Sequence, residues 1–281
     1  MTQDLVSKVR EDILTQLKND ELVLPTLPEI ALSVREVAED ENATINDLSH
    51  VLLRDPAMSA RLLRVANSPM VRTVVPITDI TTAVSRLGID FTTNLVIGIA
   101  MEQMFQATNE LIDKRMRACW SRAIEVAASA QVLARHFTQL PADQALLAGL
   151  VHQIGMLPIL AYAENSDTLL KDSLSLDHVI AELHQELGAL VLKSWDLPEA
   201  LIKVASEYLT FERQPDDVDF TDLVQVAVLQ SYTDTDHPLG QIDSATVGAF
   251  ARLGLEADEE DHQLSAIAEE VDATQYALTP R

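Results

Sequence analysis

Apolar residues recur along most of this 281-residue chain at spacings of three and four, which place them on one face of a helix. In the first twenty residues the pattern is a single apolar stripe, formed by Leu5, Val9, Ile13 and Leu17. No run alternates apolar and polar residues between turn residues for long enough to require a strand. The pattern therefore predicts helices nearly throughout the chain.

Start and stop signals divide this pattern into separate helices. Side chains that cap helix N-termini precede several apolar runs, and proline is favoured directly after such a cap. The predicted helices cover 45–54 after a Thr44–Asp47 capping box, start at Pro56 after Asp55, cover 80–87 between Asp79 and Gly88, start at Pro141, and cover 176–195 after Ser175. The polar stretch 214–219 is predicted to be a surface loop, and helical periodicity returns over 220–255.

Composition agrees with an all-α fold. The chain has 8 glycines and 11 prolines, and 47% of its residues are hydrophobic. Its length suits one large domain or two small ones. We expect a multi-helix bundle with an N-terminal helical unit (1–110), a second helical unit (111–215), and C-terminal helices with an acidic tail (216–281).

Charge excludes several classes of partner. Acidic residues outnumber basic ones 44 to 20, which gives a net charge of −24, and residues 201–281 carry 17 of the acids and 4 of the bases. Such a surface repels nucleic-acid phosphates and anionic lipid headgroups. We therefore expect no nucleic-acid partner and no membrane association. The acidic run 256–261 is interpreted first as a solubilising tail.

Two short segments, 54–72 and 113–122, run against this balance with a net charge of +3 each. We expect both to be solvated helix faces with local ion pairs. Docking of an acidic partner, or of the chain's own acidic C-terminal third, stays open for both. Their basic residues are Arg54, Arg61, Arg64, Arg72, Lys114, Arg115, Arg117 and Arg122.

The sequence carries no sign of export or membrane insertion. The single cysteine, Cys119, cannot form an internal disulfide. The N-terminus lacks a basic segment followed by an apolar run. The longest strongly apolar runs, 95–101 and 145–151, are far shorter than the roughly 20 residues that span a bilayer. We expect a cytoplasmic protein.

One motif could carry chemistry. Phosphate-binding glycine loops, H-E-x-x-H and G-x-S-x-G are all absent. What remains is Gly149-Leu-Val-His-Gln-Ile-Gly155, in an apolar helix predicted to end at Pro158. This segment resembles the G-L-L-H-D-I-G motif of the HD superfamily of metal-dependent phosphohydrolases. In that superfamily an adjacent His-Asp pair binds metal together with an upstream His, further downstream His residues and a late Asp.

Three upstream segments make the resemblance more specific. They are LPTLPEI at 24–30, DPAMSARLLRVANS at 55–68 and ITTAVSRLGI at 80–89. They resemble the signature of the HDOD family, a branch of the superfamily that is considered to have lost catalysis and to serve in bacterial signalling. The resemblance spans roughly residues 20–215. It implies an HD-domain-like fold with an N-terminal helical subdomain. It also implies partners in trans, among receiver domains, histidine kinases and cyclic-dinucleotide enzymes.

The resemblance also implies where metal ligands would lie. The corresponding positions hold Arg122 for the first His, His152–Gln153 for the His-Asp pair, His184 for the next His, Glu207–Tyr208 for a later His pair, and the apolar run 226–229 for the late Asp. Arg122, His152, Gln153, His184 and Glu207 are called the vestigial pocket below. A glutamine offers only a neutral carbonyl. A guanidinium 4 Å from a unit positive charge costs about 4 kcal/mol at an intermediate dielectric. We expect no metal, no cofactor and no hydrolysis.

For the two histidines, a structural role and a metal site both remain open. His152 and His184 could hold a transition metal together with Glu182 or Glu186. Single histidines on apolar helices are, however, usually hydrogen-bonded core residues.

Arg122 also has two interpretations, since it could bind a small anion or a nucleotide, or could pair with Glu125 or Glu186. The expected function is a non-catalytic signalling or scaffold module that acts through protein–protein contacts. The alternatives are a phosphohydrolase with an unusual ligand set and a nucleotide or anion sensor.

Overall fold

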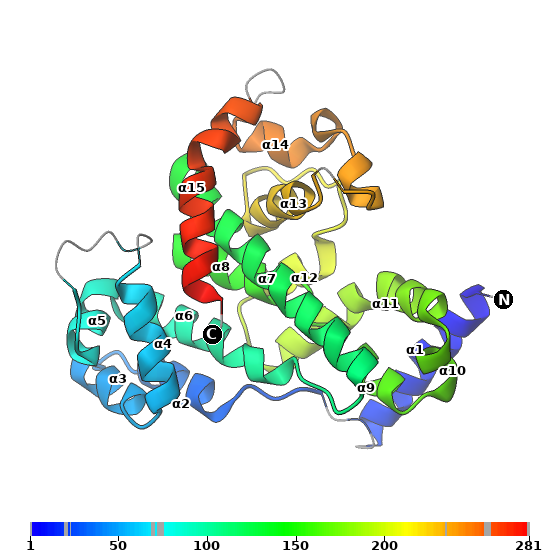
Figure 1. Ribbon diagram of the computed structural model, residues 1–281, viewed down its shortest axis with the longest axis horizontal. Coiled ribbons are helices and arrows are strands. Elements are labelled where there is room, and N and C mark those ends of the chain that lie inside the picture. Colours follow the sequence, from blue (N-terminus) through cyan, green and yellow to red (C-terminus); the bar gives the residue numbers. More distant parts are fainter. Residues whose placement is uncertain are drawn as a thin grey trace.

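The computed structural model describes residues 2–19, 22, 24–68, 71, 76–233, 235–255 and 260–279. Across these residues the chain forms α-helices and short 3-10 turns and contains no strand, which confirms the all-α prediction. The helices are arranged around the long helix α7 (Glu110–Phe137), which crosses the middle of the molecule (Figure 1). Asn109 caps α7, because its side-chain oxygen accepts hydrogen bonds from two backbone N–H groups of the first turn.

The first group of helices lies on one side of α7, coloured blue to cyan in Figure 1. Its members are α2 (Glu29–Glu39), α3 (Ile45–Leu52), α4 (Pro56–Ala66), α5 (Ile80–Leu87) and α6 (Ile89–Ala100). The predicted caps are confirmed for α3, α4 and α5, where Thr44, Asp55 and Asp79 each bond a backbone N–H of the first turn. Gly88 has a φ of +86°, which joins α5 directly to α6. Helix α6 packs on α2 and α8, so it connects this group to the centre.

The apolar segment predicted to be one helix ending at Pro158 is two helices. Helix α8 (Ala142–Val151) stops before a turn at 152–155, and α9 (Met156–Glu164) begins after it. Pro158 lies in the first turn of α9, where its missing N–H costs no helical hydrogen bond. Taken together, Ala142–Glu164 has the length and mean hydropathy of a membrane span, but 78% of its apolar window is buried inside the fold. Core packing accounts for this apolar character.

Helices α1 (Thr2–Lys18), α10 (Asp167–Lys171) and α11 (Ser173–Ser194) lie with α9 on the opposite side of the molecule (Figure 1). The apolar stripe of α1 faces inward, and its central residues Val9 and Ile13 are buried. Although α1 falls within the expected N-terminal unit, it packs on α11 and α9, which fall within the expected second unit.

The predicted start of α11 was wrong by three residues. Asp172, rather than Ser175, is its N-cap, and the Asp172 carboxylate accepts a hydrogen bond from the Ser175 backbone N–H at 3.2 Å. The Ser175 hydroxyl donates to the same carboxylate at 2.6 Å. An ionised carboxylate is a strong acceptor for the free N–H groups at a helix start, so the aspartate takes the capping position.

The C-terminal helices complete the bundle, with α13 and α14 above α7 and α8 in Figure 1 and α12 beside them. They are α12 (Glu199–Glu207), α13 (Phe220–Ser231), α14 (Gly248–Arg252) and α15 (Glu260–Leu278), with 3-10 turns η2 (Pro238–Gln241) and η3 (Ser244–Thr246). The predicted loop at 214–219 is confirmed, whereas the stretch predicted as helical over 220–255 is α-helical only in α13 and α14, with the 3-10 turns η2 and η3 between them. Helix α15 packs on α7 and α4. Residues 256–259 of the acidic run lie outside the described residues.

A buried carboxylate ties these C-terminal elements together. The Asp222 side chain is 0% exposed and bonds Arg213 Nη1 at 2.7 Å and Arg252 Nη2 at 2.8 Å. Arg213 also bonds Asp219, the N-cap of α13. Ion pairs of this kind cross between the 208–219 segment, α13 and α14, so their partners are far apart in the sequence and no local pattern predicts them.

Replacing Asp222 by asparagine should lower the free energy of unfolding by about 3–5 kcal/mol, because Arg252 loses its buried counter-charge and Arg213 keeps only Asp219 and Glu207. Urea unfolding followed by circular dichroism measures this loss. Asp217→Asn is the matched control, since Asp217 is exposed in the preceding loop. Equal stability of the two variants would contradict the assigned role of Asp222.

Candidate functional site

His152 lies in the turn between α8 and α9 and is 1% exposed. Its Nδ1 is 2.6 Å from the Gly149 carbonyl oxygen, which can only accept, so Nδ1 carries the proton. Burial lowers the pKa of His152 to about 4, which makes the ring neutral at pH 7. Its Nε2 then bears a lone pair, and it has no hydrogen-bond partner among the described residues.

His184 lies opposite on α11 and is held from both sides. Its Nδ1 donates to the Ile180 carbonyl oxygen at 2.6 Å, so its Nε2 accepts the hydroxyl proton of Tyr208 at 2.7 Å. Burial lowers the pKa of His184 and raises that of Tyr208. The Tyr208 ring meets both imidazoles edge to face, with centroids 4.9 Å from His152 and 5.6 Å from His184. The two histidines therefore share one aromatic neighbour and stay neutral.

The glycines of the motif allow this arrangement. A Cβ added at Gly155 would lie 1.9 Å from the His184 carbonyl oxygen and 2.3 Å from the Gly188 nitrogen. A Cβ added at Gly149 would lie 2.3 Å from the Ala127 Cα of α7. Only residues without a side chain let the turn touch α11 and let α8 touch α7 at these distances.

Gln153 and Cys119 form a neutral contact beside the histidines. The thiol of Cys119 lies 3.7 Å from Oε1 of Gln153, to which it donates. Burial raises the pKa of this thiol to about 12, so Cys119 is no thiolate nucleophile at neutral pH. In the motif that the sequence resembles, an aspartate stands at the position of Gln153. The Gln153 side-chain oxygen already accepts a hydrogen bond from Cys119.

Arg122 is held by three contacts on the side facing α13. Its Nη1 donates to Glu125 Oε2 at 2.9 Å and to the Ser231 carbonyl oxygen at 2.6 Å. The guanidinium carbon lies 4.3 Å from the ring centroid of Tyr232, a cation–π contact. Tyr232 in turn stacks on His237 with centroids 4.0 Å apart. Of the two acidic partners considered from the sequence, the structure selects Glu125.

The other candidate carboxylates do not approach the histidines. Glu186 pairs with Arg10 of α1, at 2.7 Å between Oε2 and Nε. The Glu207 side chain was predicted to belong to the vestigial pocket. In the structure it is 39% exposed and pairs with Arg213 at 3.3 Å instead. Its neighbour Tyr208 enters instead, because consecutive residues at a helix end point in different directions. The family resemblance pointed to the pair Glu207–Tyr208, but Tyr208 rather than Glu207 contacts the two histidines.

The donor set does not fit a divalent cation. One imidazole nitrogen, that of His152, is free, while His184 and Gln153 are engaged and Arg122 adds a positive charge. Hard cations require several converging oxygen or imidazole donors. Within the part of the chain that the structure describes, no group of three His, Cys, Asp or Glu side chains is placed to hold a metal ion.

The basic segments are largely occupied by ion pairs and by α15. Arg61 pairs with Glu102, Arg115 with Asp177 and Arg117 with Asp113, and Arg64 donates to the carbonyl oxygen of Thr279 at the end of α15. Arg54 and Lys114 are exposed and have no ion-pair partner among the described residues. Arg72 lies outside the described residues.

Acidification should destabilise the fold through the buried histidines. Burial lowers the pKa of both histidines, and that of His152 to about 4, so at His152 the unfolded chain binds more protons between pH 6.5 and about 4. The free energy of unfolding should therefore fall by up to about 1.4 kcal/mol per pH unit from His152 as pH drops through this window, and His184 should add a loss of the same sign. Urea unfolding between pH 7 and 5 should show a shallower slope for His152→Asn. His262→Asn, at an exposed position on α15, should keep the wild-type slope.

Gly155→Ala should remove the contact between the turn and α11. Backbone atoms cannot move aside cheaply, so we expect a loss of about 3 kcal/mol or more, comparable to severe overpacking. Neither Gly240 nor Gly254 is a suitable control, because a Cβ at Gly240 also meets backbone atoms and Gly254 has a φ of +72°, which disfavours any side chain. An unchanged melting temperature in Gly155→Ala would contradict the packing described here.

Comparisons with known proteins identify relatives of the same fold. The family model for the HDOD domain matches residues 24–209. An uncharacterized protein of Treponema pallidum (strain Nichols) is 24% identical over 245 residues, which cover 81% of this chain and 46% of that protein. The chain therefore spans about half the length of this curated relative.

Solved structures extend the likeness over nearly the whole chain. A Shewanella amazonensis SB2B protein with the provisional name metal-dependent phosphohydrolase matches with a TM-score of 0.85 and 29% identity, covering 98% of this chain and 100% of its own. An HDOD domain protein of unknown function from Geobacter sulfurreducens matches with a TM-score of 0.71 and 21% identity, covering both chains completely. A protein from Marinobacter aquaeolei VT8, provisionally named for signal transduction, matches at 0.67 and 21%, covering 100% of this chain and 69% of its own. Since the family model covers more than half of the sequence, the chain belongs to the HDOD domain family.

Proposed function

We propose that this chain is a non-catalytic signalling or scaffold module that acts through contacts with other proteins. The observation that carries the proposal is Arg122 at the position of the first metal-binding His. Its charge is permanent, because a guanidinium does not deprotonate in proteins. Its contacts with Glu125, Ser231 and Tyr232 hold it in place.

The two histidines of the vestigial pocket, His152 and His184, support the same proposal. Each bonds a backbone carbonyl of its own helix segment through Nδ1, and His184 also accepts from Tyr208. A general base or a metal ligand needs an accessible nitrogen, whereas His152 is 1% exposed and His184 is 4% exposed. Both residues act as parts of the core.

The names of the solved relatives point to two activities, phosphohydrolysis and signal transduction. The relative provisionally named a phosphohydrolase shares the fold of this chain at 29% identity. For this chain the donor set favours signal transduction, because hydrolysis of that class depends on a metal that these residues do not suit.

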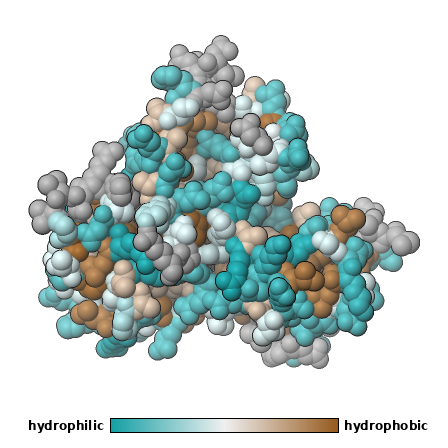
Figure 2. All heavy atoms as spheres, viewed as in Figure 1, coloured by the Kyte–Doolittle hydropathy of each residue, from teal (hydrophilic) through white to brown (hydrophobic). Residues whose placement is uncertain are grey.

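A docking surface for a partner is available at the turn between α3 and α4. Leu53 is 56% exposed and Arg54 beside it is exposed, next to a cleft lined by Ile30 and Val51. On the face shown in Figure 2 polar side chains predominate, and brown apolar patches lie over the α3–α5 side. An apolar residue beside an unpaired cation suits a partner with an acidic rim, in trans, of the kinds that the family resemblance implies.

Purified protein should contain no stoichiometric Fe, Mn or Zn, because the vestigial pocket offers too few free donors. Elemental analysis measures this directly, and hydrolysis of bis(p-nitrophenyl) phosphate with added Mn²⁺ should be the same for wild type and His152→Ala. Stoichiometric metal together with hydrolysis lost in His152→Ala would establish a phosphohydrolase and overturn the proposal.

A ligand screen tests the alternative that the vestigial pocket is a nucleotide or anion sensor. Nucleotides and cyclic dinucleotides should leave the melting temperature unchanged if the vestigial pocket is only structural. A shift that disappears in Arg122→Ala but persists in Arg86→Ala, a control on an exposed arginine, would show that the pocket binds a ligand.

A further inference from the structure

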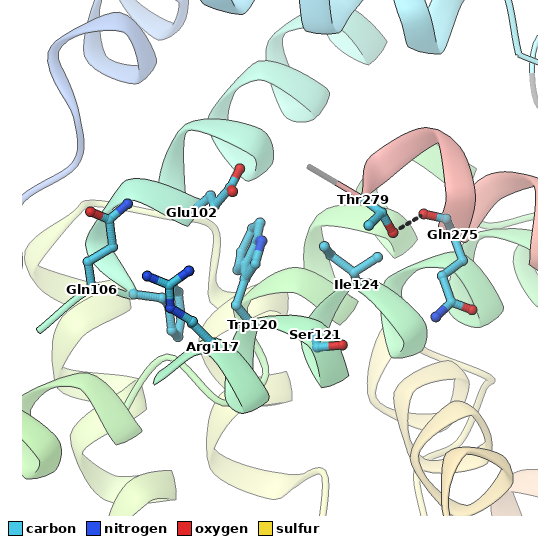
Figure 3. A pocket seen from close by; sticks show the side chains of 9 residues that line it. Glu102, Gln106, Arg117, Trp120, Ser121, Ile124, Gln275 and Thr279 are labelled. Carbon is cyan, nitrogen blue, oxygen red and sulfur yellow. Dashed lines mark hydrogen bonds between the residues drawn. The ribbon is translucent and has the colours of Figure 1, made fainter. Parts of the chain in front are cut away.

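A cavity of about 360 Å³ lies between η1 (Met101–Met104), α7 and the end of α15, apart from the vestigial pocket (Figure 3). Its volume falls in the range of small-molecule sites, about 300–1,000 Å³. Its walls come from three segments that are distant in the sequence. The lining residues are Glu102, Phe105, Gln106, Arg117, Trp120, Ser121, Ile124, Gln275 and Thr279.

Trp120 supplies an aromatic wall and an unused hydrogen-bond donor. The residue is 6% exposed, and its indole N–H has no partner among the described residues. In Figure 3 the indole nitrogen faces the space between Glu102 and Ile124. The Phe105 ring lies 5.2 Å from the Trp120 ring. A buried donor without a partner costs free energy, so an acceptor bound in this cavity would be favoured.

Arg117 gives the cavity mouth a positive charge. Its Nε bonds Asp113 at 2.7 Å, while its terminal nitrogens have no hydrogen-bond partner among the described residues and point toward Gln106 and Glu102 in Figure 3. The carboxylate of Glu102 is compensated by its ion pair with Arg61. Arg117 is itself paired with Asp113, but only through Nε, so its terminal nitrogens can donate to a ligand, and a guanidinium binds carboxylates well.

We propose that this cavity binds a small planar aromatic carboxylate that carries a second oxygen atom. The ring would lie against Trp120 and Phe105, the carboxylate would meet Arg117, and the second oxygen would accept from the indole N–H. Gln275 and Thr279 of α15 form the far wall. A bound ligand would therefore stabilise the contact of α15 with α7. This proposal goes beyond the signalling function and does not depend on it.

Isothermal titration of the full chain with 6-hydroxy-2-naphthoate tests the proposal. We expect one saturable site, weakened at least fivefold by Trp120→Phe, which keeps a smaller aromatic ring and removes the indole N–H donor. Trp195→Phe is the matched control and should bind as wild type does, because the Trp195 N–H bonds the Pro25 carbonyl oxygen elsewhere. Arg117→Gln should weaken binding of the naphthoate but not of the neutral 6-hydroxy-2-naphthamide.

Three results would overturn the proposal. They are no binding at millimolar probe, equal affinity of wild type and Trp120→Phe, or equal loss in Trp120→Phe and Trp195→Phe. If Trp120→Phe fails to fold, as judged by circular dichroism, Arg117→Gln decides alone. Arg117 is 72% exposed, so its replacement leaves the core intact. Unchanged naphthoate affinity in Arg117→Gln would then refute the site.

Discussion

The guanidinium of Arg122 acts electrostatically on the buried imidazole of His152 at the centre of this protein. Arg122 adds a positive charge that pairs with Glu125, whose pKa is raised by burial even with Arg122 beside it. The same charge helps to keep the pKa of His152 low, after burial as the main cause. A site that holds its histidines neutral and keeps a cation nearby suits a rigid core and disfavours a second cation.

Packing around this centre gives the motif at 149–155 a structural role. Gly155 lets the turn touch α11, Gly149 lets α8 touch α7, and Tyr208 fills the space between His152 and His184. These contacts connect the central helices on both sides of the turn. The motif therefore contributes to stability, and its residues need no catalytic role to be useful.

Local signals predicted much of the fold and little of the tertiary contacts. The caps at Thr44, Asp55 and Asp79 were readable because a cap and its helix are adjacent in sequence. The break at 152–155 was missed because apolar residues continue through it, although Pro158 three residues into α9 was an available signal. The family resemblance pointed to His152 and His184, which the structure brings together around Tyr208, whereas Glu207 pairs with Arg213. The Asp222 ion pairs could not be predicted, because their arginines come from separate segments.

The claim that these residues exclude a divalent cation is the centre of the account. A Mn²⁺ titration followed by electron paramagnetic resonance tests it most directly, because free Mn²⁺ gives a strong signal that disappears on tight binding. Wild-type protein should leave the free-ion signal unchanged at micromolar Mn²⁺. Loss of one equivalent of free Mn²⁺ to wild type, but not to His152→Ala, would contradict the account.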